Sequence, residues 1–196
     1  YSEDLNAYPE NIYGLYHNMR EQVVNYFNKN STLNCLNLRV TNSYGYPLNN
    51  NKRAWNLAVN QFCKDAIQNG KIFIKSDGKP QKDFIHINDV TNALLTIINN
   101  RKYLTYNTFN ISSGSTLTIL DLVKLIKNIC KDDFKIDVKI IHNIKLDSNI
   151  LKKKNEKLMK VKNNRLKNLG FKVDVEIKDG LKHLLEKLNG KAEKES

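Results

Sequence analysis

The sequence predicts an α/β fold in which most strands pair in parallel. Segments with apolar residues at helical spacing alternate along the chain with short segments typical of strands. Strands that are separated by helices are the usual source of a parallel sheet. The chain has 196 residues, of which 40% are hydrophobic and 27% charged, so it is long enough to bury the core of one domain or more.

The first 87 residues are expected to form two helices and three strands. Gly70 suits the left-handed position that ends a helix, and Gly45 and Pro47 indicate a loop. The expected elements are a helix at 11–29, a strand at 32–40, a loop at 42–52, a helix at 54–68, a strand at 71–76, a turn at 77–82 and a short strand at 83–87.

The second half continues the alternation. Asn88 is predicted to cap the third helix, and Thr118 and Asp121 form a capping box before the fourth. The expected elements are a helix at 89–100, a strand at 105–112, a loop at 113–116, a helix at 119–130, a strand at 135–141, a basic stretch at 145–167 and a final helix at 176–188.

The cysteines and histidines indicate neither a disulfide scaffold nor a metal site. Cys35, Cys63 and Cys130 are odd in number, widely spaced and without a CxxC pair. The four histidines form no HxxH or HExxH array. These features favour a reducing, cytoplasmic setting, and we expect no metal.

The net charge of +12 raises the alternative of a nucleic-acid or membrane surface. Only five of the 32 basic residues are arginine, and the basic stretch at 145–167 carries few aromatic side chains that could stack on bases. No apolar run approaches the ~20 residues that cross a bilayer. We therefore expect no nucleic acid and no membrane as partner, whereas a nucleic-acid binder would show steep salt dependence.

Four stretches of the sequence, taken in order, are similar to conserved segments of one known family. "PENIYGLYHNMRE" is similar to its P-x-x-x-Y-G-x-x-K-x-x-x-E segment, and "NLRVTNSYGYP" to its L-R-x-x-N-x-Y-G-P. "DGKPQKDFIHINDVTNALL" resembles its G-x-x-x-R-D-F-I-H-V-x-D-V-A-x-A, and "YNTFNISSGSTLTILDLVKLI" its Y-N-I-G-S-G…S-I-x-E-L. A fifth and weaker match, "LKNLGFKVDVEIKDGL", is similar to the closing segment of the same family. The family that these stretches resemble is the extended short-chain dehydrogenase/reductase family, and the matches run from about Pro9 to Leu181, nearly the whole chain.

The resemblance implies an α/β protein that is the C-terminal portion of a larger enzyme. Residues 1–50 would end a Rossmann-like, doubly wound parallel sheet, and 51–190 would form a smaller α/β substrate-binding part interleaved with the last sheet strands. Residues 191–196 would be a frayed tail. The chain contains no GxGxxG or GxxGxxG and begins with Tyr1. We therefore expect the NAD or NADP phosphate loop upstream or on another chain, and a homodimer in the assembled enzyme.

The resemblance also implies a catalytic pair. Hydride transfer at a sugar carbon requires a base that takes the hydroxyl proton, and a tyrosine serves when a cation lowers its pKa from ~10. By motif position the base is Tyr13, although an aromatic on a helix face is also typical of a core. The family's lysine is replaced by His17, and a histidine is mostly neutral at physiological pH. Both residues would contact the nicotinamide ribose, and His17 indicates either altered pH dependence or weakened catalysis.

Substrate contacts follow from the same motifs. Asn42 corresponds to the asparagine near the substrate diphosphate, although asparagine is also common in turns. Lys82 replaces the family's arginine, so it would contact the diphosphate as a point charge without the bidentate fork. Asn56 and Leu57 fall near the positions where the family holds the base and sugar of its substrate, so the resemblance implies that they contact this part of the substrate.

The implied function is that of an NAD(P)-dependent nucleotide-sugar epimerase, dehydratase or reductase. The nucleotide, the sugar and the reaction subtype stay open. The alternative is a non-catalytic relative that binds a nucleotide sugar or a partner protein through the same cleft.

Overall fold

A computed structural model describes residues 1–5, 8–48, 52–142 and 160–195. Most of the basic stretch expected at 145–167 lies outside these residues. In the part of the chain that the structure describes, none of the helices has the length and apolarity needed to cross a membrane.

Three small sheets confirm the α/β class and its parallel pairing. β1 (Asn37–Val40) pairs in parallel with β5 (Thr108–Ile111), β2 (Asn42–Tyr44) with β4 (Gln81–His86), and β3 (Lys71–Ile74) with β7 (Lys139–His142). An antiparallel strand, β6 (Thr116–Thr118), joins the other edge of β4. Sequence patterns did not predict this strand, because residues 113–116 were expected to form a loop.

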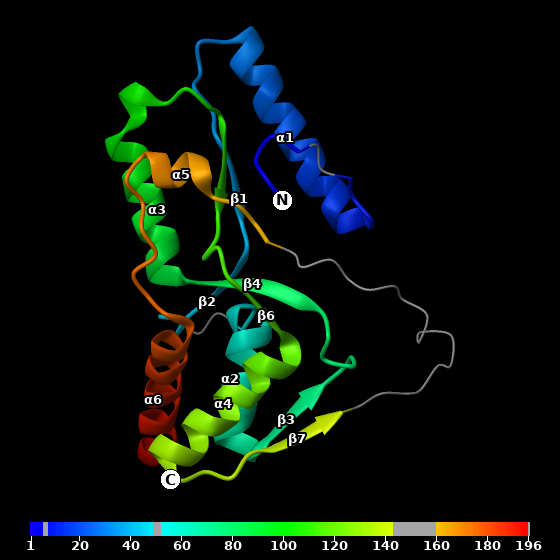
Figure 1. Cartoon of the computed structure of the whole chain (residues 1–196), viewed down its shortest axis with the longest axis vertical. Coiled ribbons are helices and arrows are strands. Elements are labelled where there is room, and N and C mark those ends of the chain that lie inside the picture. Colours follow the sequence, from blue (N-terminus) through cyan, green and yellow to red (C-terminus); the bar gives the residue numbers. More distant parts are fainter. Residues whose placement is uncertain (6–7, 49–51, 143–159, 196) are drawn as a thin grey trace.

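The helices are α1 (Ile12–Asn30), α2 (Ala58–Asn69), α3 (Ile87–Asn99), α4 (Ile119–Phe134), α5 (Asn164–Asn168) and α6 (Ile177–Glu195), with 3-10 turns η1 (Ala54–Asn56) and η2 (Arg101–Tyr103). Among the described residues two hydrophobic cores form, to which α1 contributes no residue, and the elements around them lie in the upper and in the lower part of Figure 1. We call the upper one the strand core; its buried residues are Ile85, Ala93, Ile97, Phe109, Ile111, Leu166 and Phe171. The lower one, the helix core, is formed mainly by α2, α4 and α6 with β3.

Two of the predicted helix ends are confirmed and one is wrong. Thr118 caps α4, and its hydroxyl accepts from the Asp121 N–H at 3.0 Å. Gly70 ends α2 in the left-handed conformation. Asn88 is not the cap of α3, because His86 takes that place and its Nδ1 accepts from the Asn88 N–H at 3.3 Å. α6 also reaches Glu195, beyond the predicted end at 188 and into the residues expected to fray.

Several predicted strands are shorter or displaced for identifiable reasons. The strand expected at 32–40 begins only at Asn37. The Asn28 side chain takes up both backbone groups of Cys35, in hydrogen bonds of 2.7 and 2.9 Å, so Cys35 cannot use them to pair with another strand. Residues 42–44 were expected in a loop, yet they form β2 against β4. The strand expected at 135–141 begins at Lys139, because α4 continues to Phe134 and Lys135 ends it with a φ of 61°.

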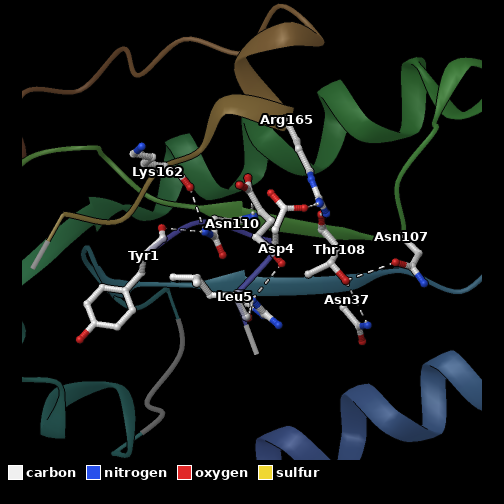
Figure 2. Close-up of polar contacts among 11 residues, drawn as sticks. Tyr1, Asp4, Leu5, Asn37, Asn107, Thr108, Asn110, Lys162 and Arg165 are labelled. Carbon is white, nitrogen blue, oxygen red and sulfur yellow. Dashed lines mark hydrogen bonds and ion pairs between the residues drawn. The ribbon is translucent and has the colours of Figure 1, made fainter. Parts of the chain in front are cut away.

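The first five residues lie across the strand core (Figure 2). The Asn110 side chain on β5 donates to the carbonyl of Lys162 at 2.8 Å, and the Lys162 N–H donates to the carbonyl of Tyr1 at 2.8 Å. Arg165 pairs with Asp4 and donates to the carbonyl of Thr108 at 2.9 Å. The N-terminal segment, β5 and the segment before α5 are thereby tied together.

Candidate functional site

A cavity of about 860 Å³ lies between α1 and β1. α1 lies on one side of the β1–β5 pair, with α3 and α5 on the other (Figure 1). From α1 the cavity receives a stripe of side chains at helical spacing, namely Tyr13, His17, Arg20, Glu21 and Val24. The opposite wall is β1 and the start of β2, residues 36–43, closed by Leu57, Ala58, Val59 and Phe84.

α1 forms as a helix through its caps but buries none of its residues. The Asn11 side chain accepts from the Gly14 N–H at 2.8 Å, and the Ser31 N–H donates to the Phe27 carbonyl at 2.9 Å. Its apolar side chains remain exposed, among them Ile12, Tyr16, Met19, Val23 and Tyr26, each more than half exposed. Among the described residues, α1 therefore carries much apolar surface that nothing covers.

Tyr13 and His17 both line the cavity and lie next to each other. Their ring centroids are 4.5 Å apart and the planes meet at 71°, an edge-to-face contact between residues one helical turn apart. The Tyr13 side chain is 72% exposed, so its hydroxyl is accessible to a ligand. The predicted pair is therefore adjacent in space and open to the cavity.

An ion pair connects α1 to β1 across the cavity. Arg39 donates from Nε and from one terminal nitrogen to the two carboxylate oxygens of Glu21, both at 2.7 Å. The hydrogen bond to Glu21 raises the pKa of Arg39. The second terminal nitrogen of Arg39 also approaches the carbonyls of Glu3 and Leu5, both at 3.4 Å. Arg39 thus joins α1, β1 and the N-terminal segment.

The predicted substrate residues divide into two pairs. Asn42 and Leu57 line the same cavity as Tyr13, whereas Asn56 and Lys82 are not among its lining residues. Asn42 is exposed, and its Nδ2 donates one of its two hydrogens to the Asp83 carbonyl at 3.0 Å, which leaves the second hydrogen available as a donor. Lys82 is exposed on β4, beside Asp83, which is fully buried.

The buried side chain of Asn60 holds the loop that follows β2. Asn60, 1% exposed, accepts from the Gly45 N–H at 3.1 Å and donates to the carbonyls of Gly45 and Ala54 at 2.9 and 3.0 Å. Tyr46 and Trp55 meet edge to face above it. These contacts set the position of η1, where Asn56 lies.

Sequence reasoning gave no role to Glu21, Arg39 or Asn60. Glu21 and Arg39 stand in the quoted motifs, and the spacing 13, 17, 21 places Glu21 on the face of Tyr13 and His17. Helical periodicity could therefore have identified Glu21 as a residue of the site. Its pairing with Arg39 joins residues 18 apart in sequence and required the structure.

This chain is similar to two proteins whose names refer to nucleotide-linked sugars. It is 25% identical over 171 residues to CDP-abequose synthase of Salmonella typhimurium, covering 86% of this chain and 53% of that protein. It is 29% identical over 128 residues to UDP-glucose 4-epimerase of Mycoplasma genitalium, covering 58% of this chain and 38% of that protein. The chain thus spans about half or less of the length of these relatives.

The fold is also found in solved structures. UDP-glucuronic acid 4-epimerase of Bacillus cereus, determined with a UDP sugar and NAD, superposes with a TM-score of 0.77 at 18% identity, over 97% of this chain and 56% of that one. Residues 1–112, more than half of the chain, match the model of a single family. The chain belongs to the NAD dependent epimerase/dehydratase family.

Proposed function

We propose that this chain is the substrate-binding part of an NAD(P)-dependent epimerase, dehydratase or reductase that acts on a nucleotide sugar by hydride transfer at a sugar carbon. The family and the two named relatives support this class of enzyme. The observation that carries the proposal is the Tyr13–His17 pair, which stands on the same cavity as Asn42 and Leu57.

Tyr13 is the proposed base. As a sugar hydroxyl becomes a carbonyl, its proton passes to the Tyr13 oxygen, which is exposed toward the cavity. A nicotinamide, when bound, supplies the hydride acceptor for this step. His17, 4.5 Å from the Tyr13 ring, is placed to modulate the phenol and to hydrogen-bond a ribose hydroxyl.

The residues present fit the ribose end of such a cofactor. Tyr13 and His17 offer a hydroxyl and an imidazole on one helix face, both of which hydrogen-bond sugar hydroxyls. The glycine-rich loop that cradles the cofactor phosphates is not part of these 196 residues. Localisation in the cytoplasm is part of the proposal, since such cofactors and activated sugars are dissolved there.

We place the diphosphate of the substrate between Asn42 and Lys82, which flank Asp83 from β2 and β4. Asn56 and Leu57, at the end of η1, would contact the base or sugar. Since Lys82 does not line the cavity, its ammonium has to reach the diphosphate from the rim, where its exposed side chain is free to turn.

The cavity is also proposed as an assembly site. β1 pairs with β5 along one edge, while among the described residues its other edge carries no strand and lies at the cavity. An unpaired strand edge is suited to an added strand, and the exposed apolar side chains of α1, which lie outside the cavity lining, are suited to a protein partner. We propose that an N-terminal half, upstream or on another chain, supplies that strand, and that α1 contributes to a homodimer. Residues 1–196 alone should then self-associate with increasing concentration, as sedimentation would show.

The test of catalysis uses the product of the complete reading frame, with NAD⁺ or NADP⁺ and a panel of nucleotide sugars that includes UDP-glucose and CDP-glucose. Conversion is followed by NMR of the sugar. Tyr13→Phe should lower kcat at least about 100-fold, the usual contribution of a general base. Tyr16→Phe, on the same helix and away from the cavity, is the matched control and should leave kcat unchanged.

His17→Lys separates the enzyme from the non-catalytic relative. In an enzyme this change should leave turnover equal or raise it, because an ammonium stabilises a tyrosinate better than a neutral imidazole. Turnover abolished by the change would assign His17 a role of its own. A protein that binds the nucleotide sugars but converts none of them, with or without the change, would be the non-catalytic relative.

A further inference from the structure

Two fully buried carboxylates hold the connections between the strand core and the helix core. Among the described residues, four connections pass between the cores: Thr41 between β1 and β2, residues 112–115 between β5 and β6, the β4–α3 junction at His86, and residues 172–176 between α5 and α6. Asp83 and Asp89 lie beside them, both with 0% of their surface exposed.

Asp83 joins the first two connections. Its Oδ1 accepts from the Thr41 hydroxyl at 2.8 Å and from the Ser113 N–H at 2.9 Å, and its Oδ2 accepts from the Gly114 N–H at 2.9 Å. Gly114 has a φ of 78°, a conformation that presents its N–H to the carboxylate. A buried carboxylate is stable only when it accepts hydrogen bonds. Asp83 therefore holds the Thr41 hydroxyl and the N–H groups of Ser113 and Gly114 in place.

Asp89 joins the other two. It lies in the first turn of α3, directly after the β4–α3 junction, and accepts from the N–H groups of Asp174 and Val175 at 3.0 and 3.2 Å. In the part of the chain that the structure describes, the hydrogen bonds of its side chain reach no residue that lines the cavity. The two aspartates are therefore alike in burial and in chemistry but differ in what they hold.

The hydrogen bonds of Asp83 connect it to two residues of the candidate site. Thr41 and Asn42 both line the cavity, and Asn42 donates from Nδ2 to the backbone carbonyl of the same Asp83. The side chain of Asp83 thus holds Thr41, and the backbone carbonyl of Asp83 holds Asn42. Lys82, on the other side, is its chain neighbour. The placement of both proposed diphosphate contacts thus depends on the one residue that also closes the β5–β6 connection.

We propose that Asp83 is a positioning residue for nucleotide-sugar binding: it sets the β1–β2 connection so that Asn42 faces the cavity, whereas Asp89 fixes the angle between the cores without acting on the site. The binding part of this inference rests on the proposed function. The structural part rests on the hydrogen bonds alone.

The experiment compares Asp83→Asn with Asp89→Asn in the product of the complete reading frame. Each change keeps the shape and replaces one acceptor oxygen by a donor, so each should lower the Tm by about 3–8 °C. UDP-glucose and CDP-glucose are titrated by calorimetry well below either Tm. Asp83→Asn should weaken binding of the nucleotide sugar at least about tenfold, and Asp89→Asn by less than about twofold. Equal effects of the two changes on Kd, or no effect of Asp83→Asn, would overturn the inference.

Hydrogen exchange provides the readout that does not depend on a ligand. Asp83→Asn should raise the exchange rate at least about tenfold in residues 41–44 and 113–114, while Asp89→Asn should do so at 174–175. Unchanged exchange at 41–44 in Asp83→Asn would refute the positioning role. A wild-type protein that binds neither sugar would exclude UDP-glucose and CDP-glucose as ligands and leave the exchange result to judge the positioning. Thr41→Val, which removes a single hydroxyl donor, is the milder second variant and should change exchange in the same direction.

Discussion

Arg39 on β1 and Glu21 on α1 form a two-pronged ion pair, with both N–O distances at 2.7 Å. The Arg39 and Glu21 side chains are 27% and 21% exposed, which limits competition from water. Since α1 buries none of its residues, this pair is a principal tie between the helix that carries Tyr13 and the sheet.

A double-mutant cycle with Glu21→Ala and Arg39→Ala should therefore give a coupling energy of about 1–3 kcal/mol in urea unfolding, as for partly buried, bidentate pairs. The pair Asp77–Lys79 is the control, because its N–O distance is 3.6 Å and its side chains are 52% and 81% exposed. Its coupling should stay below about 1 kcal/mol. Equal couplings for the two pairs would show that α1 is held by something else.

Gly180 in α6 is expected to be intolerant of any side chain. A Cβ at this position would overlap the hydroxyl of Tyr44 and come within 3.0 Å of its ring. Tyr44 is 2% exposed, so the ring has no room to move. Gly180→Ala should lower the free energy of unfolding by about 1–3 kcal/mol, the usual cost of overpacking.

Gly190→Ala is the matched control in the same helix. Among the described residues nothing lies within 4 Å of a Cβ at Gly190, so alanine should stabilise the protein by up to about 1 kcal/mol through helix propensity. Tyr44→Phe should cost little, because the Tyr44 hydroxyl has no hydrogen-bond partner among the described residues. Combined with Gly180→Ala it should recover part of the loss. A Gly180→Ala variant as stable as wild type would refute the packing argument.

Sequence patterns predicted the elements that rest on local chemistry. The capping residue Thr118 and the left-handed Gly70 act through neighbours in sequence, and both are confirmed. The Tyr13–His17 pair was likewise visible, because residues four apart share a helix face. The roles assigned to these two residues are still predictions.

The missed features depend on partners far along the chain. β2 reads as a loop because Asn42 and Ser43 are polar, and it becomes a strand only through pairing with β4, some 40 residues away. His86 displaces Asn88 as the cap of α3, because its imidazole is held within the fold next to the helix start. The network around Asp83 joins residues 30 to 42 apart, beyond what periodicity detects.

The three thiols should differ sharply in reactivity. Burial raises the pKa of Cys63, and it raises the pKa of Cys130 to about 11, while both side chains are inaccessible. Cys35 is partly exposed. Because alkylation requires an accessible thiolate, iodoacetamide at pH 8 should modify Cys35 alone in the native protein and all three in denaturant, as measured by mass spectrometry. Labelling of Cys63 or Cys130 at the rate of Cys35 would contradict the packing of the helix core.

His86 should make the protein less stable in mild acid. Its side chain is 4% exposed, and burial lowers its pKa below 6.5, although Asp89 opposes and His183 assists this shift. The unfolded chain then binds a proton more readily than the native one, so stability is complete above pH 6.5 and falls from there down through the lower folded-state pKa. Protonation would also remove the Nδ1 acceptor that caps α3.

His86→Asn keeps a capping acceptor but does not titrate, so urea unfolding from pH 8 to about 5 should show a shallower decline in this variant than in wild type. Every other titrating group is common to both proteins, and parallel curves would therefore exclude His86 as the source of the acid sensitivity.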